Sequence, residues 1–362
     1  MTQFRLYYPE ELYDPKYRGQ LFPLLKPFLK NKEYSDAERI KLYATSSSDF
    51  ILVKGAAQAD VIVIPMSWNY YVINKKREQL IEFLQRHSKL GKKIFIYNLG
   101  DIGLKIPHFE NVLIFRLTVN RLPKPENVII IPPFIQDPLR THFKSLEIFS
   151  NPYMETPVIG FCGFAKSSKL DAFRELTKIS FQNILSMFGV RNEEPQQLLS
   201  SSYFRGEILK KLTRAKNIRT NFIVRKNYRA GIKTSNNSHP TVVDFFNNLK
   251  ESDYTLCARG SGNFSIRFYE TLAMGRIPVY VNTEGALPLE NTIDWNNHVV
   301  WVEKKNVHQV DKILDNFHRQ LDSEGFLDLQ IRNRKLWEEQ LRLGPYFKNV
   351  IASLILNNAE RE

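Results

Sequence analysis

Short runs of β-branched and aromatic residues recur through residues 1–150 and alternate with helical patterns. Asp60–Pro65 is a continuous apolar run, which is typical of a strand buried on both faces of a parallel sheet. Lys75–Lys89 carries apolar residues at helical spacing, and Gly91 after it favours a helix end. The other strands predicted in this half are Phe4–Tyr8, Phe50–Lys54, Lys93–Tyr97, Val112–Leu117 and Val128–Ile131.

The same alternation returns after Pro132–Thr156, a polar and proline-containing stretch that we interpret as an interdomain linker. The strands predicted beyond it are Val158–Cys162, Asn221–Val224, Tyr254–Cys257, Ile277–Val281 and His298–Val302. The helices predicted beyond it are Asp171–Phe188, Phe204–Thr213, Val242–Lys250, Phe264–Met274, Val307–Phe317 and the charged, amphipathic Glu324–Leu343.

This order of elements predicts an α/β protein with two Rossmann-like domains that face a central cleft. We expect a first domain at residues 1–150, a second at 151–322, and a helical segment at 323–362 that packs back on the first. A chain of 362 residues suits two domains. Ligands of open parallel sheets bind beyond the carboxyl ends of the strands, so the cleft is the expected site.

The net charge of +13 favours polyanionic partners such as nucleic acid, an anionic membrane or phosphorylated small molecules. The densest basic cluster, Arg205–Lys233, is compatible with a solvated surface, with membrane contact or with phosphate binding. It lacks the interleaved aromatic residues on which bases stack, so we do not expect nucleic acid as a partner.

Cys162 and Cys257 each lie in an apolar, strand-like run, which predicts buried free thiols. Two cysteines cannot build a disulfide scaffold, and the histidines show no ligand spacing, so no metal site is predicted. Neither a secretory leader at Met1–Tyr8 nor an apolar run of about 18 residues is recognisable. We therefore expect a cytoplasmic protein, at most peripheral to a membrane.

The segment that carries the chemistry is a strand, a glycine-containing loop and a helix. Gly260 and Gly262 let the backbone approach a ligand closely, and the helix start that follows offers free N–H groups to an anion. Arg259 ends the strand and has the geometry to bind phosphate. Ser265 can donate to phosphate oxygens.

Arg267 and Glu270 are three residues apart on the predicted helix, so they project to nearby faces. Arg267 could reach a diphosphate, and Glu270 could accept hydrogen bonds from two ribose hydroxyls. The alternative is a local ion pair on a solvated helix. The loop is not the dinucleotide fingerprint, because Ser265 replaces the third glycine, and no Gly-Lys-Ser/Thr of a P-loop follows.

The stretch Ser252–Val279 closely resembles the carboxyl-terminal half of the exostosin glycosyltransferases. The shared positions are Ser252, Arg259, Gly260, Gly262, Ser265, Arg267, Glu270, Leu272, Gly275, Ile277, Pro278 and Val279, followed by Leu287–Leu289 and Ile293–Trp295. Ala258 stands where the family has proline. Weaker similarities lie at Ala59–Pro65, Lys93–Gly103 and Phe161–Lys166.

The resemblance implies a GT-B glycosyltransferase that uses a UDP-sugar, inverts the anomeric centre and acts on a glycan, polysaccharide or lipid-linked acceptor. It implies no cofactor and no metal, because basic side chains and a helix start stabilise the leaving diphosphate. The donor-binding residues that it implies are Arg259, Gly260, Gly262, Ser265, Arg267 and Glu270, with Gly163 and Lys166 in a phosphate loop. Arg267 is also expected to act in catalysis.

An inverting transfer needs a base for the acceptor hydroxyl, and we expect it from the first domain. Asp101, after the strand Lys93–Tyr97, is the first choice, although an aspartate there also suits a turn. The alternatives are Glu10, Glu11 and Asp49. Trp68, Tyr70 and Tyr71 either stack on an acceptor sugar or belong to the core.

Three other functions stay open at this point. One is a transferase of the same fold that uses a GDP-sugar. Another is a homologue that binds glycan without catalysis, which would keep the donor loop and lose the base. Nucleic-acid binding is the least favoured.

Overall fold

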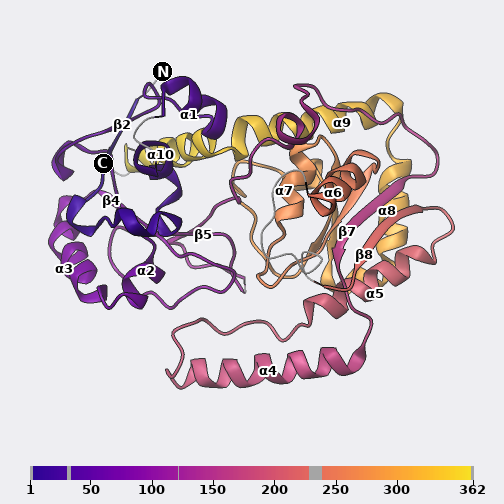
Figure 1. Ribbon diagram of the computed structural model, residues 1–362, viewed down its shortest axis with the longest axis horizontal. Coiled ribbons are helices and arrows are strands. Elements are labelled where there is room, and N and C mark those ends of the chain that lie inside the picture. Colours follow the sequence, from indigo (N-terminus) through magenta and orange to yellow (C-terminus); the bar gives the residue numbers. More distant parts are fainter. Residues whose placement is uncertain (1–2, 31–33, 121, 228–238, 360–362) are drawn as a thin grey trace.

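The computed structural model describes residues 3–30, 34–120, 122–227 and 239–359. The chain forms two α/β domains, each built on one sheet of parallel strands (Figure 1). The predicted fold class, α/β with two Rossmann-like domains, is therefore confirmed.

The first sheet has the order β2-β1-β3-β4-β5-β6, and all its neighbouring strands are parallel. Its strands are β1 (Phe4–Tyr7), β2 (Phe50–Leu52), β3 (Val61–Val63), β4 (Lys93–Tyr97), β5 (Val112–Arg116) and β6 (Val128–Ile130). Helices α1 (Asp36–Tyr43), α2 (Trp68–Ile73) and α3 (Arg77–His87) belong to this domain. The central strands are buried, which explains their continuous apolar sequence.

Helix α2 was not among the predicted elements, and it changes the interpretation of three aromatic residues. Ser67 caps the helix by accepting a hydrogen bond from the backbone N–H of Tyr70. Trp68, Tyr70 and Tyr71 are all almost fully buried in the first core. Their proposed stacking on an acceptor sugar is therefore wrong, because no ring face is open to a ligand.

The second sheet has the order β11-β10-β9-β7-β8 and is also parallel throughout. Its strands are β7 (Val158–Phe164), β8 (Arg219–Arg225), β9 (Tyr254–Cys257), β10 (Ile277–Asn282) and β11 (Val300–Glu303). Its helices are α4 (Lys169–Met187), α5 (Ser201–Thr213), α6 (Pro240–Lys250), α7 (Ile266–Ala273) and α8 (Val310–Arg319). β11 begins later than predicted because Trp295–Asn297 forms a 3₁₀ turn.

The last part of the chain is two helices rather than the single helix Glu324–Leu343 of the prediction. Helix α9 (Ser323–Leu336) continues into a short π-helical turn that ends at Arg342, whose backbone is extended. Helix α10 (Leu343–Ala359) follows and crosses to the first domain (Figure 1). Its Tyr346 and Phe347 belong to the first core. The Tyr346 hydroxyl donates to the Ile130 carbonyl at 2.7 Å.

An ion pair fixes the stretch between the domains to α9, through Asp137 of that stretch and Arg334 of the helix. Asp137 and Arg334, both buried, are 2.7 Å apart. The basic cluster lies along α5 and β8, with Arg229 and Lys233 outside the described residues. Within the described part of the chain, no helix is long and apolar enough to cross a lipid bilayer.

Candidate active site

The loop from Gly260 to Phe264 lies at the carboxyl end of β9 and closes on itself. The Gly260 N–H donates to the Phe264 carbonyl at 2.9 Å. A Cβ on Gly262 would lie 2.8 Å from the carbonyl oxygen of Asp101, in the first domain. Only glycine therefore allows the two domains to approach this closely here. We call residues 260–264 the donor loop.

The amino-terminal end of α7 follows the donor loop and is open to solvent. Ser265 has the extended backbone of a cap residue, yet its side chain makes no capping hydrogen bond. This extended residue is why α7 begins two positions after the predicted start at Phe264. Ile266, the first helical residue, is 45% exposed. The Phe268 N–H already donates to the Ser265 carbonyl at 3.1 Å, so the N–H groups of Ile266 and Arg267 are the ones that an anion could bind.

Arg259 is 5% exposed, and its hydrogen bonds hold the guanidinium at the base of the donor loop. It donates to the side chain of Gln197 at 2.7 Å and to the Ser261 carbonyl at 3.3 Å. Its Nε has no acceptor among the described residues. Burial lowers the pKa of Arg259 to about 10, which leaves it a cation at neutral pH in a poorly solvated place.

Arg267 projects from α7 toward β7 rather than into solvent. Its Nη2 donates to the Cys162 carbonyl at 2.9 Å, and its guanidinium lies 4.5 Å from the ring centre of Phe161. Its Nε also lacks an acceptor within the described residues, and burial lowers its pKa. A Cβ on Gly163 would lie 2.6 Å from Nη2, so this glycine makes room for Arg267.

Glu270, one helical turn after Arg267, is half-buried. No ion pair joins it to Arg267 in the described part of the chain, so the alternative that the sequence left open is not formed. The Glu270 carboxylate has no hydrogen bond or ion pair among the described residues. Burial raises the pKa of Glu270 to about 7, and Arg267 opposes this shift. A partnerless, poorly solvated carboxylate costs folding free energy, which favours a role toward a ligand.

Asp101 lies against the donor loop, although it belongs to the first domain. Its carboxylate accepts a hydrogen bond from the Ser261 hydroxyl. Beside it, Thr118 donates to the Asn263 carbonyl at 2.8 Å, and the Asn263 amide donates to the Val119 carbonyl at 3.1 Å. The first-choice base and the donor loop are thus in direct contact.

The remaining candidates lie apart from this contact or are already paired. Asp49 precedes β2, at the amino-terminal edge of the sheet, and pairs with Lys348 at 2.8 Å. It is therefore excluded as a base. Glu10 and Glu11 are exposed in a turn after β1. Lys166 pairs with Asp171 at 3.0 Å.

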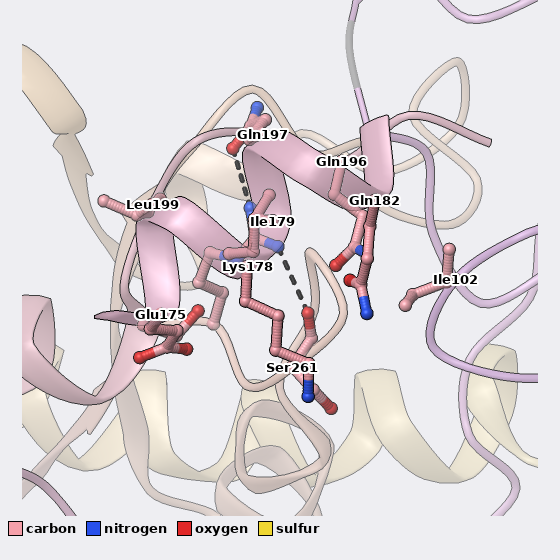
Figure 2. Close-up of a pocket in the computed structure, with 11 residues that line it drawn as sticks. Ile102, Glu175, Lys178, Ile179, Gln182, Gln196, Gln197, Leu199 and Ser261 are labelled. Atoms are coloured by element: carbon pink, nitrogen blue, oxygen red, sulfur yellow. Dashed lines mark hydrogen bonds between the residues drawn. The ribbon is translucent and has the colours of Figure 1, made fainter. Parts of the chain in front are cut away.

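A cavity of about 250 Å³ opens beside the donor loop (Figure 2). Ile102 of the first domain lies on its opposite side from Glu175 of α4. The two hydrogen bonds drawn in Figure 2 are those of the Arg259 guanidinium. The residues that line the cavity are Ile102, Glu175, Lys178, Ile179, Gln182, Gln196, Gln197, Leu199, Ser201, Arg259 and Ser261.

Two residues of this site were not predicted to act in it. Asn263 joins the domains, and its side-chain amide also donates a hydrogen bond to the Thr283 carbonyl at 3.0 Å. Its place inside the glycine-containing loop was the available signal. Gln197 bridges Arg259 and the Thr283 carbonyl, and its sequence surroundings carry no motif.

Cys162 and Cys257 are buried free thiols, as predicted, and burial raises the pKa of both, that of Cys257 to about 12. Among the residues that the structure describes, no three His, Cys, Asp or Glu side chains gather as metal ligands would.

Residues 191–317, which include the donor loop and α7, match the Exostosin GT47 domain. Residues 191–317 of this chain are thus similar to an exostosin domain. This confirms the family resemblance of the motif from Ser252 to Val279. The match covers β8 to β11 and ends within α8.

Named relatives align with parts of this chain. Exostosin-1 of Drosophila melanogaster is 33% identical over 95 residues, which is 26% of this chain and 12% of that protein. Probable beta-1,4-xylosyltransferase IRX10 of Arabidopsis thaliana is 32% identical over 76 residues, 21% of this chain and 18% of that protein. The chain thus spans less than a fifth of either relative. An alignment with the structure of a glycosyltransferase from Rickettsia africae covers 100% of this chain and 99% of that chain, with 11% sequence identity and a TM-score of 0.34.

Proposed function

We propose that this chain is an inverting glycosyltransferase that moves a sugar from a UDP-sugar to a glycan or polysaccharide acceptor. The observation that carries the proposal is the pair of poorly solvated guanidinium groups, Arg259 and Arg267, beside the open start of α7. Each has an Nε without an acceptor among the described residues. Two such cations and a helix start are suited to a diphosphate.

The diphosphate is the leaving group of the transfer, and its negative charge grows as the glycosidic bond breaks. Arg259, Arg267 and the first N–H groups of α7 would stabilise that charge in a site with little water. Glu270 would bind the ribose hydroxyls, which supplies the hydrogen bonds its carboxylate lacks in the free protein. This chemistry requires no metal ion.

Asp101 would take the proton of the acceptor hydroxyl as that oxygen attacks the anomeric carbon from the face opposite the diphosphate. Its contact with Ser261 supports this role, because it keeps the carboxylate beside the donor loop. A single displacement of this kind inverts the anomeric centre. The names of the relatives, which include xylosyltransferases and glucuronosyltransferases, support transfer of a glycosyl group.

The test is nucleotide binding measured by thermal shift and calorimetry. We expect UDP, and not GDP, to raise the melting temperature. Arg267→Ala and Glu270→Ala should each weaken UDP binding at least about tenfold, because each removes hydrogen bonds to or from a charged group. The control is Arg319→Ala, which removes an exposed arginine paired with Asp315 on α8 and should leave UDP binding unchanged.

Each other outcome has a distinct meaning. Stabilisation by GDP alone would favour the GDP-sugar transferase. Binding of UDP without hydrolysis or transfer of any UDP-sugar in a panel would favour the inactive glycan-binding homologue. No response to either nucleotide, or equal UDP binding by both variants and the control, would refute the proposed site.

A further inference from the structure

Helix α4 lies apart from both sheets at one edge of the molecule (Figure 1), and near its end the Ser186 carbonyl accepts a hydrogen bond from Lys105 of the first domain. The segment that returns from it, residues 189–200, covers one side of the helix. Asn183 donates to the Gln196 carbonyl at 2.7 Å, and the Ser186 hydroxyl donates to the Glu193 carbonyl at 2.6 Å. Ala172 and Ser186 are accordingly buried. The opposite side of α4 has no such cover.

That uncovered side carries large apolar side chains near both ends of the helix, with the exposed Thr177 between them. Its large side chains are Leu170, Phe173, Phe181, Ile184 and Phe188, which are 73%, 70%, 61%, 50% and 81% exposed. Their spacing of three, eight, three and four residues places them on one face of a helix. We call these five residues the outer stripe. Exposed apolar residues scattered singly are ordinary, but five on one face of a helix mark an interaction surface.

Cations border the outer stripe, whereas the acidic residues of α4 are engaged elsewhere. Lys169 is exposed, and the Arg174 side chain is 80% exposed. Asp171 pairs with Lys166, and Glu175 accepts a hydrogen bond from Ser200 at 2.5 Å. The surface that α4 presents to the outside therefore combines large apolar side chains with positive charge.

An apolar cavity of about 460 Å³ opens on the same flank, between α4 and the start of α5. Phe173 belongs both to its lining and to the outer stripe, and Lys169 also lines it. The cavity could take the end of a hydrocarbon chain whose headgroup lies near Lys169.

We propose that α4 docks on an anionic lipid bilayer. The outer stripe enters the boundary between headgroups and acyl chains, and Lys169 and Arg174 contact anionic headgroups. A second copy of this chain fits the outer stripe less well than a bilayer does. Two such faces would bring like charges together, because the net charge of the protein is +13.

Docking in this way would hold the candidate active site near the membrane. Glu175 and Ile179, on the other side of α4, line the cavity beside the donor loop. That cavity would lie about one helix diameter, roughly 10 Å, from the bilayer surface. The geometry suits an acceptor carried on a lipid.

The test is co-sedimentation of the full chain with vesicles of phosphatidylcholine, with or without phosphatidylglycerol. We expect binding to the anionic vesicles that weakens as salt rises. Phe173→Ser and Phe181→Ser should each weaken it about tenfold. Arg174→Ala should weaken it roughly fivefold. The matched control is Ile73→Ser on α2, where the isoleucine is 73% exposed, and it should bind as the native chain does.

Two results would overturn the proposal. One is vesicle binding that the outer-stripe variants leave unchanged. The other is a native chain that is dimeric by light scattering and becomes monomeric in the Phe173→Ser variant, which would assign the stripe to a second copy. Far-ultraviolet circular dichroism and melting temperature check that the variants fold. The readout is lipid binding, so it is independent of the proposed transfer reaction.

Discussion

Replacing Glu270 by glutamine should make the protein more stable at alkaline pH and have little effect at acidic pH. The pKa of Glu270 is about 7 in the folded chain, against an ordinary 4.5, because burial disfavours its charged form. Between these two values the folded protein binds more protons than the unfolded one. The free energy of unfolding therefore falls as pH rises from about 4.5 to about 7, and this contribution is constant above that range.

The size of the effect follows from the two pKa values. Their difference corresponds to about 3 kcal/mol at about 1.4 kcal/mol per pH unit. Residual water around a half-buried group reduces this, so we expect about 2 kcal/mol. Glu270→Gln keeps the shape of the side chain and removes the charge. The free energy of unfolding of the variant should then be about 2 kcal/mol higher than that of the native chain near pH 8 and equal to it near pH 4.5.

The assay is urea denaturation of both chains at these two pH values, followed by circular dichroism. The control is Glu126→Gln, because Glu126 is an exposed loop carboxylate and its neutralisation should change stability little at either pH. The reasoning would be refuted by a Glu270→Gln variant that is no more stable than the native chain near pH 8. An equal gain at both pH values would also contradict it, since the gain would then not come from ionisation.

Three further predictions test the neighbouring residues. Asp101→Asn should bind UDP normally and lower kcat for transfer at least about a hundredfold, as expected for loss of a general base; unchanged transfer would exclude Asp101. Gly163→Ala should weaken UDP binding about tenfold by calorimetry, because the added methyl would displace the Arg267 guanidinium; native affinity would show that this position of Arg267 is unnecessary. Arg276→Met should cost about 3 kcal/mol in urea denaturation, because Arg276 is fully buried and bonds Gln330 and several carbonyls. A fully stable Arg276→Met would contradict this structural role.

The parallel sheets could be predicted because their strands are encoded locally. A strand buried on both faces requires an unbroken apolar run, and each run predicted as a strand between Phe4 and Val302 coincides with an observed strand. The same holds for the strand, donor loop and helix at 254–273. Arg259, Ser265, Arg267 and Glu270 lie within twelve residues of one another, so their proximity follows from chain geometry.

Contacts between distant segments could not be predicted in this way. Asp101 and Ser261 are 160 residues apart, and only the packing of the two domains brings them together. Gln197 reaches Arg259 through a segment without a motif. The need for glycine at position 163 arises from Arg267, a side chain that comes from another element.

Burial was likewise decided by the tertiary structure. Trp68 belongs to an apolar cluster that the sequence places near a ligand edge, yet it is enclosed in the core. Phe173 and Phe181 have the spacing of a packed helix, yet they face outward. Local pattern determines that a residue is apolar and on which face of its helix or strand it lies. Which faces are covered depends on where the other elements pack, because burial is a property of all the surfaces that meet.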